Sequence, residues 1–319
     1  MRIVVALGGN ALLQRGQPMT PAAQTANVAI ACHALAALIA DGHQIIVTHG
    51  NGPQIGLLAL QGSVGAKGAA QPLDVLGAET DGMIGYLIEQ ALAGLLSASA
   101  EVVTLLTRIR VDAADPAFIH PSKPIGPFYD EAAARSLAAD RGWQVARDGP
   151  RWRRVVASPE PLEILEIRAI KRLVDAGVVV ICAGGGGIPV TATANGGTAG
   201  VEAVIDKDSA SCLLAQDIHA DRLLLLTDVD AVYVDFGLPT ARAIRSAGSD
   251  SLAGIHFASG SMGPKIDAAA HFVRSSHGGT GGRQAAIGRL ADAVAILRGE
   301  AGTCIQAGRG AVTIRDSAA

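Results

Sequence analysis

The stretch from Val178 to Ser209 constrains the fold of this chain more than any other. Its first residues, 178–182, form the short apolar run that is typical of a strand buried on both faces of a parallel sheet. The run leads into four glycines, Gly184 to Gly187, whose backbone N–H groups can approach an anion closely because no side chain intervenes. We therefore expect a buried strand that ends in an anion-binding loop.

Two earlier strands are predicted to end in the same way. Residues 2–7 (RIVVAL) lead into Gly8-Gly9-Asn10, and residues 44–48 (QIIVT) lead into His49-Gly50-Asn51-Gly52. Consecutive parallel strands joined by a helix lie side by side, and ligands bind at their carboxyl ends. Each loop alone is compatible with a plain tight turn, but three such loops favour one shared pocket.

Composition narrows the class of protein. A chain of 319 residues allows two lobes or one large α/β domain, and the net charge of -3 argues against nucleic acid as the main partner. The sequence has no run of eighteen apolar residues and no secretion signal, so we expect no membrane span and a cytoplasmic location. Four scattered cysteines suggest reduced thiols, and the histidines lack the spacing of a zinc site.

The lysines are few and specifically placed. The chain has 21 Arg and only 5 Lys. In a chain with so few lysines, a lysine within a motif suggests a position that needs a compact ammonium group, which the wide planar fork of arginine does not replace. Lys207 lies between two aspartates at a predicted helix start, and Lys265 follows a glycine-rich helix entry that suits phosphate. Lys123 lies among prolines that fix the backbone around it.

The remaining segments complete an alternating α/β pattern with one interruption. Residues 115–159, rich in proline, are predicted to leave the main sheet as an excursion with a short helix and hairpin strands. The other predictions are helices over residues 20–39, 74–96, 161–176, 206–216, 252–256, 265–273 and 291–298, strands over 101–106, 222–227, 231–234, 284–287 and 303–305, a flexible loop over 191–200, and a loose tail from residue 306.

Familiar catalytic signatures are missing. No glycine precedes a lysine as a P-loop requires, Pro189 occupies a glycine position of the dinucleotide fingerprint, and no Gly-x-Ser-x-Gly motif occurs. The chain offers several glycine loops, three placed lysines and a carboxylate. Phosphoryl transfer needs two anions held in line with their charge neutralised, and this inventory suits that chemistry.

Six motifs in order resemble carbamate kinase, a member of the amino acid kinase fold family. The resemblance covers about residues 2–305, and the Pro-rich setting of Lys123 is specific to the carbamate kinase branch. The motifs are Ala6-Leu-Gly-Gly-Asn10, His49-Gly-Asn-Gly-Pro-Gln54, Lys123-Pro-Ile-Gly-Pro127, Gly184 to Pro189, Glu202-Ala-Val-Ile-Asp-Lys-Asp208 and Gly260-Ser-Met-Gly-Pro-Lys265.

This resemblance implies an α/β fold with an open, mostly parallel sheet sandwiched by helices, in two lobes with a small protruding subdomain. The N-terminal lobe, residues 1–217 including the subdomain at 115–159, would hold carbamate or carbamoyl phosphate. The C-terminal lobe, residues 218–319, would hold ATP or ADP with Mg²⁺. The family also implies a homodimer.

The resemblance also implies the roles of individual residues. Lys207 and Lys265 would stabilise the transferring phosphoryl group, Asp208 would orient them, and Lys123 would reach over carbamoyl phosphate. The implied substrate contacts are Gly8, Gly9, Asn10, Gly50, Asn51, Gly52, Gly184, Gly185 and Gly186. The implied nucleotide contacts are Thr227, Asp228, Val229, Tyr233, Met262, Gly263 and Lys265.

Two other functions stay open at this stage. The chain could phosphorylate another small carboxylate or amino acid, or it could be a nucleotide-binding regulator without activity, since a fold does not fix a function. The glycine-rich loops 193–200 and 275–283 and the tail after residue 305 depart from the family pattern. Sequence does not say whether the reaction makes ATP, as in arginine or purine-derived catabolism, or consumes it.

Overall fold

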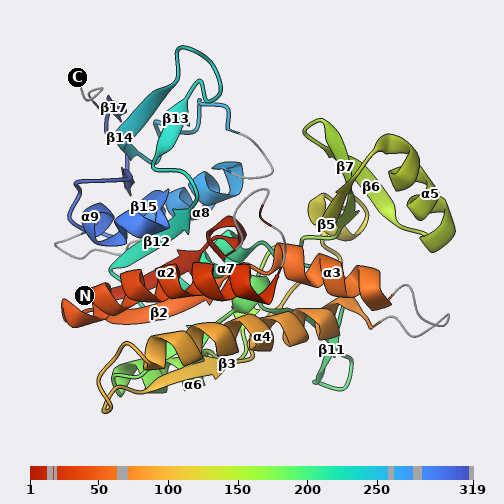
Figure 1. Cartoon of the computed structure of the whole chain (residues 1–319), viewed down its shortest axis with the longest axis horizontal. Helices are drawn as coiled ribbons and strands as arrows, with labels where there is room; N and C mark the ends of the chain where they lie inside the picture. Colours follow the sequence, from red (N-terminus) through yellow and green to blue (C-terminus); the bar gives the residue numbers. More distant parts are fainter. Residues whose placement is uncertain (13–16, 18–19, 63–70, 258–261, 276–281, 316–319) are drawn as a thin grey trace.

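A ten-stranded sheet runs through the middle of the molecule (Figure 1). This computed structural model describes residues 1–12, 17, 20–62, 71–257, 262–275 and 282–315, with residues 10 and 11 described by their backbone alone. The strand order is β13-β14-β16-β15-β12-β1-β2-β9-β3, with β17 paired to β14, and the six strands from β15 to β3 are parallel. The mostly parallel α/β fold is therefore confirmed. The strands are β1 (Arg2–Leu7), β2 (Gln44–His49), β3 (Val102–Leu105), β9 (Val179–Cys182), β12 (Arg222–Thr227), β13 (Val232–Val234), β14 (Arg242–Gly248), β15 (Gln284–Arg289), β16 (Thr303–Gln306) and β17 (Thr313–Ile314).

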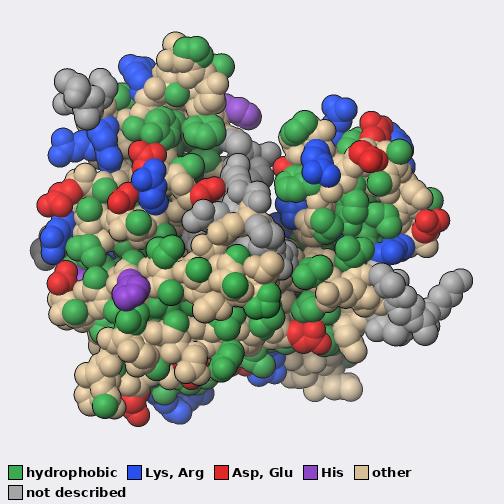
Figure 2. All heavy atoms as spheres, viewed as in Figure 1, with side chains coloured by type: hydrophobic (Ala, Val, Ile, Leu, Met, Phe, Trp, Pro, Cys, Tyr) green, Lys and Arg blue, Asp and Glu red, His purple; other side chains and the backbone are tan. Residues whose placement is uncertain are grey.

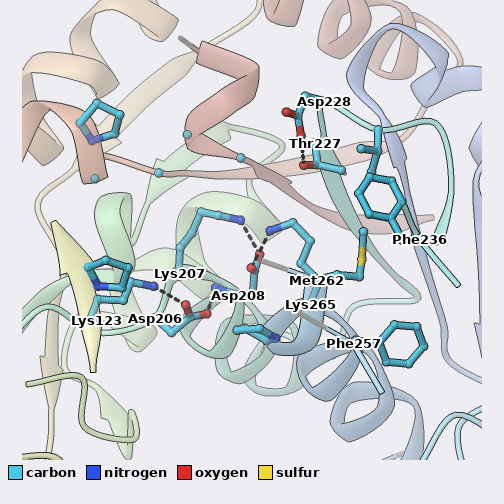
Figure 3. Close-up of a pocket in the computed structure, with 18 of the residues that line it drawn as sticks. Lys123, Asp206, Lys207, Asp208, Thr227, Asp228, Phe236, Phe257, Met262 and Lys265 are labelled. Carbon is cyan, nitrogen blue, oxygen red and sulfur yellow. Dashed lines mark hydrogen bonds and ion pairs between the residues drawn. The ribbon is translucent and has the colours of Figure 1, made fainter. Parts of the chain in front are cut away.

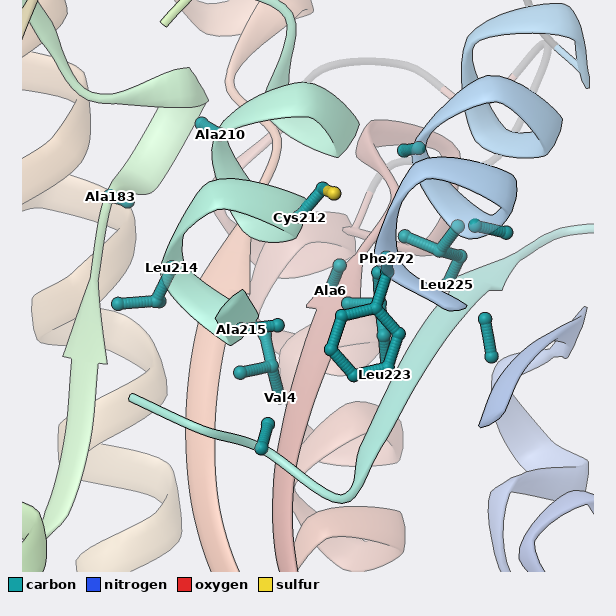
Figure 4. Packing of buried hydrophobic residues seen from close by; sticks show 14 of the residues in the cluster. Val4, Ala6, Ala183, Ala210, Cys212, Leu214, Ala215, Leu223, Leu225 and Phe272 are labelled. Atoms are coloured by element: carbon teal, nitrogen blue, oxygen red, sulfur yellow. The ribbon is translucent and has the colours of Figure 1, made fainter. Parts of the chain in front are cut away.

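Helices cover both faces of this sheet, which explains why its central strands carry apolar residues on both faces. The odd-numbered residues of β1 belong to one core with α2 and α4, and its even-numbered residues belong to the other with α6, α7 and α8 (Figure 4). Val4 and Ala6 lie beside Phe272 of α8 in that second core. The helices are α1 (Gly9–Leu12), α2 (Pro21–Ala40), α3 (Gly52–Gly62), α4 (Leu73–Ala93), α6 (Ile167–Asp175), α7 (Lys207–Asp217), α8 (Met262–Arg274) and α9 (Ala293–Leu297), with 3₁₀ turns η1 (Pro116–Phe118), η2 (Gly184–Gly186) and η3 (Leu290–Asp292).

The central sheet continues across the position where the two predicted lobes meet. Strand β1 from the N-terminal half pairs in parallel with β12 from the C-terminal half, from Ile3 opposite Arg222 to Leu7 opposite Leu226. One buried cluster also draws on both halves. The division at residue 218 stays a prediction.

The proline-rich excursion forms a separate small unit that protrudes from the body (Figures 1 and 2). It consists of β5 (Lys123–Tyr129), α5 (Glu131–Arg141), β6 (Gln144–Asp148) and β7 (Arg151–Val156), with an antiparallel sheet in the order β5-β7-β6. Its base lies against α3, where a Cβ on Gly56 would come within 2.0 Å of the Gly126 backbone. Two glycines therefore set how closely the protruding subdomain approaches the body.

A smaller four-stranded sheet includes two segments whose structure differs from the sequence prediction. It has the order β11-β10-β4-β8, with β4 (Arg108–Arg110), β8 (Glu163–Ile164), β10 (Ile188–Ala192) and β11 (Thr198–Gly200). The flexible loop predicted over 191–200 is wrong, because β10 and β11 form an antiparallel hairpin there. The helix predicted from residue 161 is wrong at its start, because residues 163–164 pair with β4 and the helix begins at Ile167.

Two further segments of the C-terminal part differ from prediction. Residues 252–256 form turns rather than a helix. The tail predicted to be loose contains β17, which pairs with β14, and β14 itself was not predicted. Its sequence, RAIRSAG, has neither a long apolar run nor strict alternation, so periodicity gives no clear strand signal.

Helix α2 is long and apolar enough to cross a membrane by length and composition, although polar residues interrupt its apolar sequence. Its buried residues instead pack in the core, among them Val28, Leu35 and Leu38. Such a helix near the N-terminus is weak evidence for a span, because core helices of soluble proteins pass the same test. All four cysteines are free, and burial raises the pKa of the Cys32 and Cys212 thiols to about 12.

Candidate active site

A cavity of about 800 Å³ opens at the carboxyl ends of β1, β2 and β12, and residues of the protruding subdomain form part of its wall. Parallel strands of an α/β sheet place their following loops at this edge, so glycine turns far apart in sequence meet there. The cavity has a glycine-lined end, a charged middle and an aromatic end, each built by different elements. Figure 3 shows the labelled side chains of the middle and aromatic parts converging on one space.

The charged middle of the cavity comes from the first turn of α7 and from α8. Lys207 and Asp208 open α7, and both are buried, at 8% and 3% exposure. The two carboxylate oxygens of Asp208 accept separate bonds, Oδ1 from the Lys207 ammonium and Oδ2 from the Lys265 ammonium at 2.8 Å (Figure 3). One carboxylate therefore fixes two lysines that lie 58 positions apart in the sequence.

Burial and charge shift the pKa values of these three groups in different directions. Burial alone would raise the pKa of Asp208, but Lys207 and Lys265 outweigh it and hold that pKa well below its usual range. Burial lowers the pKa of Lys207 in spite of Asp208, and the charge of Lys265 adds to this. The pKa of Lys265 is raised, because its attraction to Asp208 outweighs its burial.

Two ammonium groups on one carboxylate leave one positive charge in excess. Lys123 and Asp206 form a second ion pair at the cavity wall, and this pair is neutral. These five groups together carry three positive and two negative charges, a local net charge of +1. Elsewhere in the cavity wall Arg153 adds one positive charge, and Asp228 and Asp235 add two negative ones. A buried excess of positive charge favours the binding of an anion. A phosphoryl group in transfer carries negative charge and is therefore a suitable ligand.

Lys123 reaches the cavity from the protruding subdomain, at the start of β5. Its ammonium bonds Oδ2 of Asp206, whereas Oδ1 of Asp206 accepts the backbone N–H groups of Asp208 and Ser209. Asp206 is thereby the N-cap of α7, at the helix start that the sequence predicts. The bond between Asp206 and Lys123 was not predicted, because capping alone accounts for an aspartate at a helix start.

The glycine-lined end is built by the predicted loops. Of the predicted substrate contacts, the cavity wall contains Gly8, Gly9, Gly50, Asn51, Gly52 and Gly185. The loops crowd one another, since a Cβ on Gly50 would lie 2.8 Å from the Gly9 backbone nitrogen. The buried amide of Asn51 donates to Thr80 Oγ1 at 2.8 Å. Glycines at this end therefore allow the loops to approach one another closely, and they also leave the backbone accessible to a ligand.

Two of the predicted substrate contacts fall elsewhere. Gly184 and Gly186 lie outside the cavity lining, and both are buried. A Cβ on Gly184 would lie 2.0 Å from Asp81 Oδ1, and one on Gly186 would lie 2.3 Å from the Ile205 carbonyl. These glycines pack the loop against the protein below it. Asn10 belongs to α1, and its side chain lies outside the described residues.

The aromatic end of the cavity follows β12 and precedes α8. The predicted Thr227, Asp228, Val229, Tyr233 and Met262 all line it, and Gly263 does not. The Tyr233 and Phe236 rings pack edge to face, with their centroids 5.9 Å apart. Phe236, Ile255 and Phe257 also line the cavity, and they were not predicted because they lie in segments without a motif. Apolar and aromatic walls of this kind suit the flat face of a nucleobase.

Among the described residues, no group of three or more His, Cys, Asp or Glu side chains is arranged to hold a metal ion. Protein sites for Mg²⁺ with nucleotides commonly need only one or two carboxylates, because the phosphates supply other oxygens. The donors here fit that pattern, since Asp228 lines the cavity beside Thr227, whose hydroxyl donates to it at 3.0 Å.

Comparisons with known proteins agree with this site. The profile of the amino acid kinase family matches residues 1–280, and the chain belongs to that family. It is 53% identical over 307 residues to a carbamate kinase of Rhizobium meliloti, covering 96% of this chain and 93% of the relative. It is 50% identical over 305 residues to a carbamate kinase of Haemophilus influenzae, covering 96% of each chain.

A solved carbamate kinase from Giardia lamblia bound to AMP-PNP has a similar structure. It is 39% identical with a TM-score of 0.85, and the match covers 96% of this chain and 98% of the other. Within the amino acid kinases, these full-length relatives place the chain with the carbamate kinases. It is accordingly a phosphotransferase, and the family resemblance noted in the sequence is confirmed.

Proposed function

We propose that the protein catalyses the reversible reaction ATP + carbamate ⇌ ADP + carbamoyl phosphate. In the forward direction a carbamate oxygen attacks the γ-phosphorus while the bond to the β–γ bridging oxygen breaks. The single observation that carries the proposal is the pair of buried lysines on one carboxylate, with excess positive charge between a glycine-lined end and an aromatic end. Full-length similarity to carbamate kinases supports the choice of carbamate.

We assign each end of the cavity to one substrate. The glycine loops and Lys123 would hold carbamate or carbamoyl phosphate, and the aromatic end would hold the nucleotide. Lys207 and Lys265 would then neutralise charge on the phosphoryl group between them, and Asp208 would keep both ammonium groups in place. This assignment matches the proposed lobes 1–217 and 218–319. Mg²⁺ would enter with the nucleotide, with Asp228 as a carboxylate within the cavity.

We also propose that the protein is a homodimer. The outer face of α4 carries three exposed apolar residues, Val75, Met83 and Tyr86, the last of them 60% exposed. Leu106, 51% exposed, continues the patch beyond edge strand β3, since its side chain lies within 3.7 Å of where a Gly82 Cβ would be. Light scattering should give twice the chain mass, and Met83→Glu with Tyr86→Glu should shift it toward one chain.

A substrate panel tests the proposed reaction. ADP and Mg²⁺ are incubated with carbamoyl phosphate, acetyl phosphate or an acyl phosphate of an amino acid, and ATP is measured by a coupled assay. We expect carbamoyl phosphate to support the fastest ATP formation by a wide margin. Preference for another acyl phosphate would favour a kinase of a different small carboxylate, and no ATP from any donor would favour the silent regulator. A cytoplasmic location and a place in arginine or purine-derived catabolism remain parts of the proposal.

A further inference from the structure

Asp206 occupies a position between the protruding subdomain and the catalytic helix. Its Oδ1 accepts the backbone N–H groups of Asp208 at 2.8 Å and Ser209 at 3.3 Å. Its Oδ2 accepts the ammonium of Lys123, which comes from β5. One carboxylate therefore caps α7, the helix that carries Lys207 and Asp208, and also bonds Lys123 (Figure 3).

The two partners differ in how firmly they are held. Asp206 is fixed by its helix bonds and by the ordered start of α7. Lys123 has a flexible four-carbon stem, its side chain is 28% exposed, and it would otherwise sample several rotamers. Bonding to a rigid carboxylate selects the rotamers that keep the ammonium at the cavity wall.

The ion pair is not needed to dock the subdomain on the body. Ile125 and Val156, at the subdomain's base, are buried in one cluster with Ile55 and Ala59 of α3. The contact between Gly56 and Gly126 adds to this interface. Loss of the Lys123–Asp206 bond should therefore release the lysine side chain without releasing the subdomain.

We propose that Asp206 is a positioning residue that holds the Lys123 ammonium ready over the substrate end of the cavity. This inference rests on the proposed function, because it assigns Asp206 a part in carbamoyl phosphate binding. The rotamer entropy of Lys123 is then lost before substrate arrives, which strengthens binding. A purely electrostatic role would have the opposite sign, since removing a carboxylate beside an anion site strengthens anion binding. The direction in which carbamoyl phosphate binding changes when the carboxylate is removed therefore decides between the positioning role and the electrostatic role.

Asp206→Asn separates the two roles of this residue. Asparagine also caps helices well, so α7 keeps its cap, whereas the negative charge toward Lys123 is lost. We expect the KM for carbamoyl phosphate to rise about five- to tenfold, the size of a partly exposed charge-assisted bond. The KM for ADP should change less than about twofold, because the nucleotide end lies away from Lys123.

Two further variants show that the effect passes through Lys123. In a Lys123→Met background, Asp206→Asn should add almost nothing to the KM for carbamoyl phosphate. Asp130→Asn is the matched control, because Asp130 caps α5 of the same subdomain through Ala133 N at 2.8 Å. It should leave both KM values unchanged. A lowered KM in Asp206→Asn, or an equal effect in both backgrounds, would overturn the proposal.

A second readout does not depend on turnover. The rate at which an acylating reagent labels Lys123 is measured by mass spectrometry, with Lys171 on α6 as the internal reference. Asp206→Asn should increase the labelling of Lys123 several-fold relative to Lys171, because the ammonium is no longer held. An unchanged ratio would contradict the positioning role even in an active enzyme. Failure of ATP formation with an increased ratio would instead reject the proposed reaction and leave the held lysine in place.

Discussion

Replacing Asp208 tests the electrostatics of the site most sharply. Its carboxylate bonds the ammonium groups of both Lys207 and Lys265, and its side chain is only 5% exposed. Asp208→Asn keeps the shape of the side chain and removes the negative charge between two cations. The variant should therefore hold two buried ammonium groups without their shared counter-charge.

The expected loss of stability follows from this burial. Removing one partner of a buried ion pair costs about 3–5 kcal/mol, because the remaining charge is left without compensation. The side chains of Lys207 and Lys265 are 10% and 12% exposed, so water replaces little of the lost interaction. Burial already lowers the pKa of Lys207, and loss of its proton would limit the damage. We expect the free energy of unfolding to fall by about 3 kcal/mol at pH 7.

Urea unfolding and steady-state turnover measure the two consequences together. Turnover should fall at least about 100-fold, the usual result of losing a preorganised electrostatic contact in an active site. Asp175→Asn is the matched control, because Asp175 pairs with Arg2 at 2.6 Å but is 64% exposed. That change should cost less than about 1 kcal/mol. Asp208→Asn with Lys207→Met should be more stable than Asp208→Asn alone. A loss within 1 kcal/mol together with near-normal turnover would refute the reasoning.

The same carboxylate predicts how stability depends on pH. The pKa of Asp208 in the folded protein lies below its ordinary value of 3.8, so the unfolded chain binds its proton first as the pH falls. Its contribution is therefore fully present above the unfolded pKa and is lost as the pH falls through the folded pKa. Between pH 5 and pH 3, wild-type stability should fall more steeply than that of Asp208→Asn. Parallel curves would show that Asp208 is not ion-paired in solution.

Four other substitutions and one control follow from the structure. Lys207→Ala and Lys265→Ala should each lose most turnover while circular dichroism shows an unchanged fold; near-normal activity in both would reject the assignment. Lys123→Ala should mainly raise the KM for carbamoyl phosphate, and an unchanged KM would contradict its proposed role. Gly184→Ala should lower the free energy of unfolding by about 2 kcal/mol, since its Cβ would lie 2.0 Å from a buried carboxylate oxygen. Gly77→Ala in helix α4, with nothing within 4 Å of its added Cβ, should cost nothing in the same urea experiment.

The parts of the fold that sequence predicted are those where local signals agree with tertiary burial. The runs RIVVAL and RLLLLT became adjacent central strands, because a strand buried on both faces needs apolar residues at every position. Thr20 before Pro21 marked the start of α2, and its hydroxyl accepts from Ala23 N as a cap should. Loops after such strands meet by topology, so the cavity's glycine-lined end was also predictable.

Sequence patterns failed where pairing between distant segments decides the structure. Residues 191–200 have a loop-like composition, yet they form a hairpin because β10 extends the pairing that begins at β4. Gly184 has the same local signal as Gly185, but it packs against Asp81 and His49, and only Gly185 lines the cavity. Phe236 and Phe257 line the aromatic end of the cavity through long-range packing, which no sequence motif indicates.

We propose above all that this cavity passes a phosphoryl group between carbamoyl phosphate and ADP. The most direct test is ³¹P NMR of the purified protein with Mg²⁺, ADP and fresh carbamoyl phosphate, beside an enzyme-free control for spontaneous decay. We expect the β-phosphate signal of ATP to grow as the carbamoyl phosphate signal falls, one for one. Decay to inorganic phosphate at the control rate, without ATP, would contradict it.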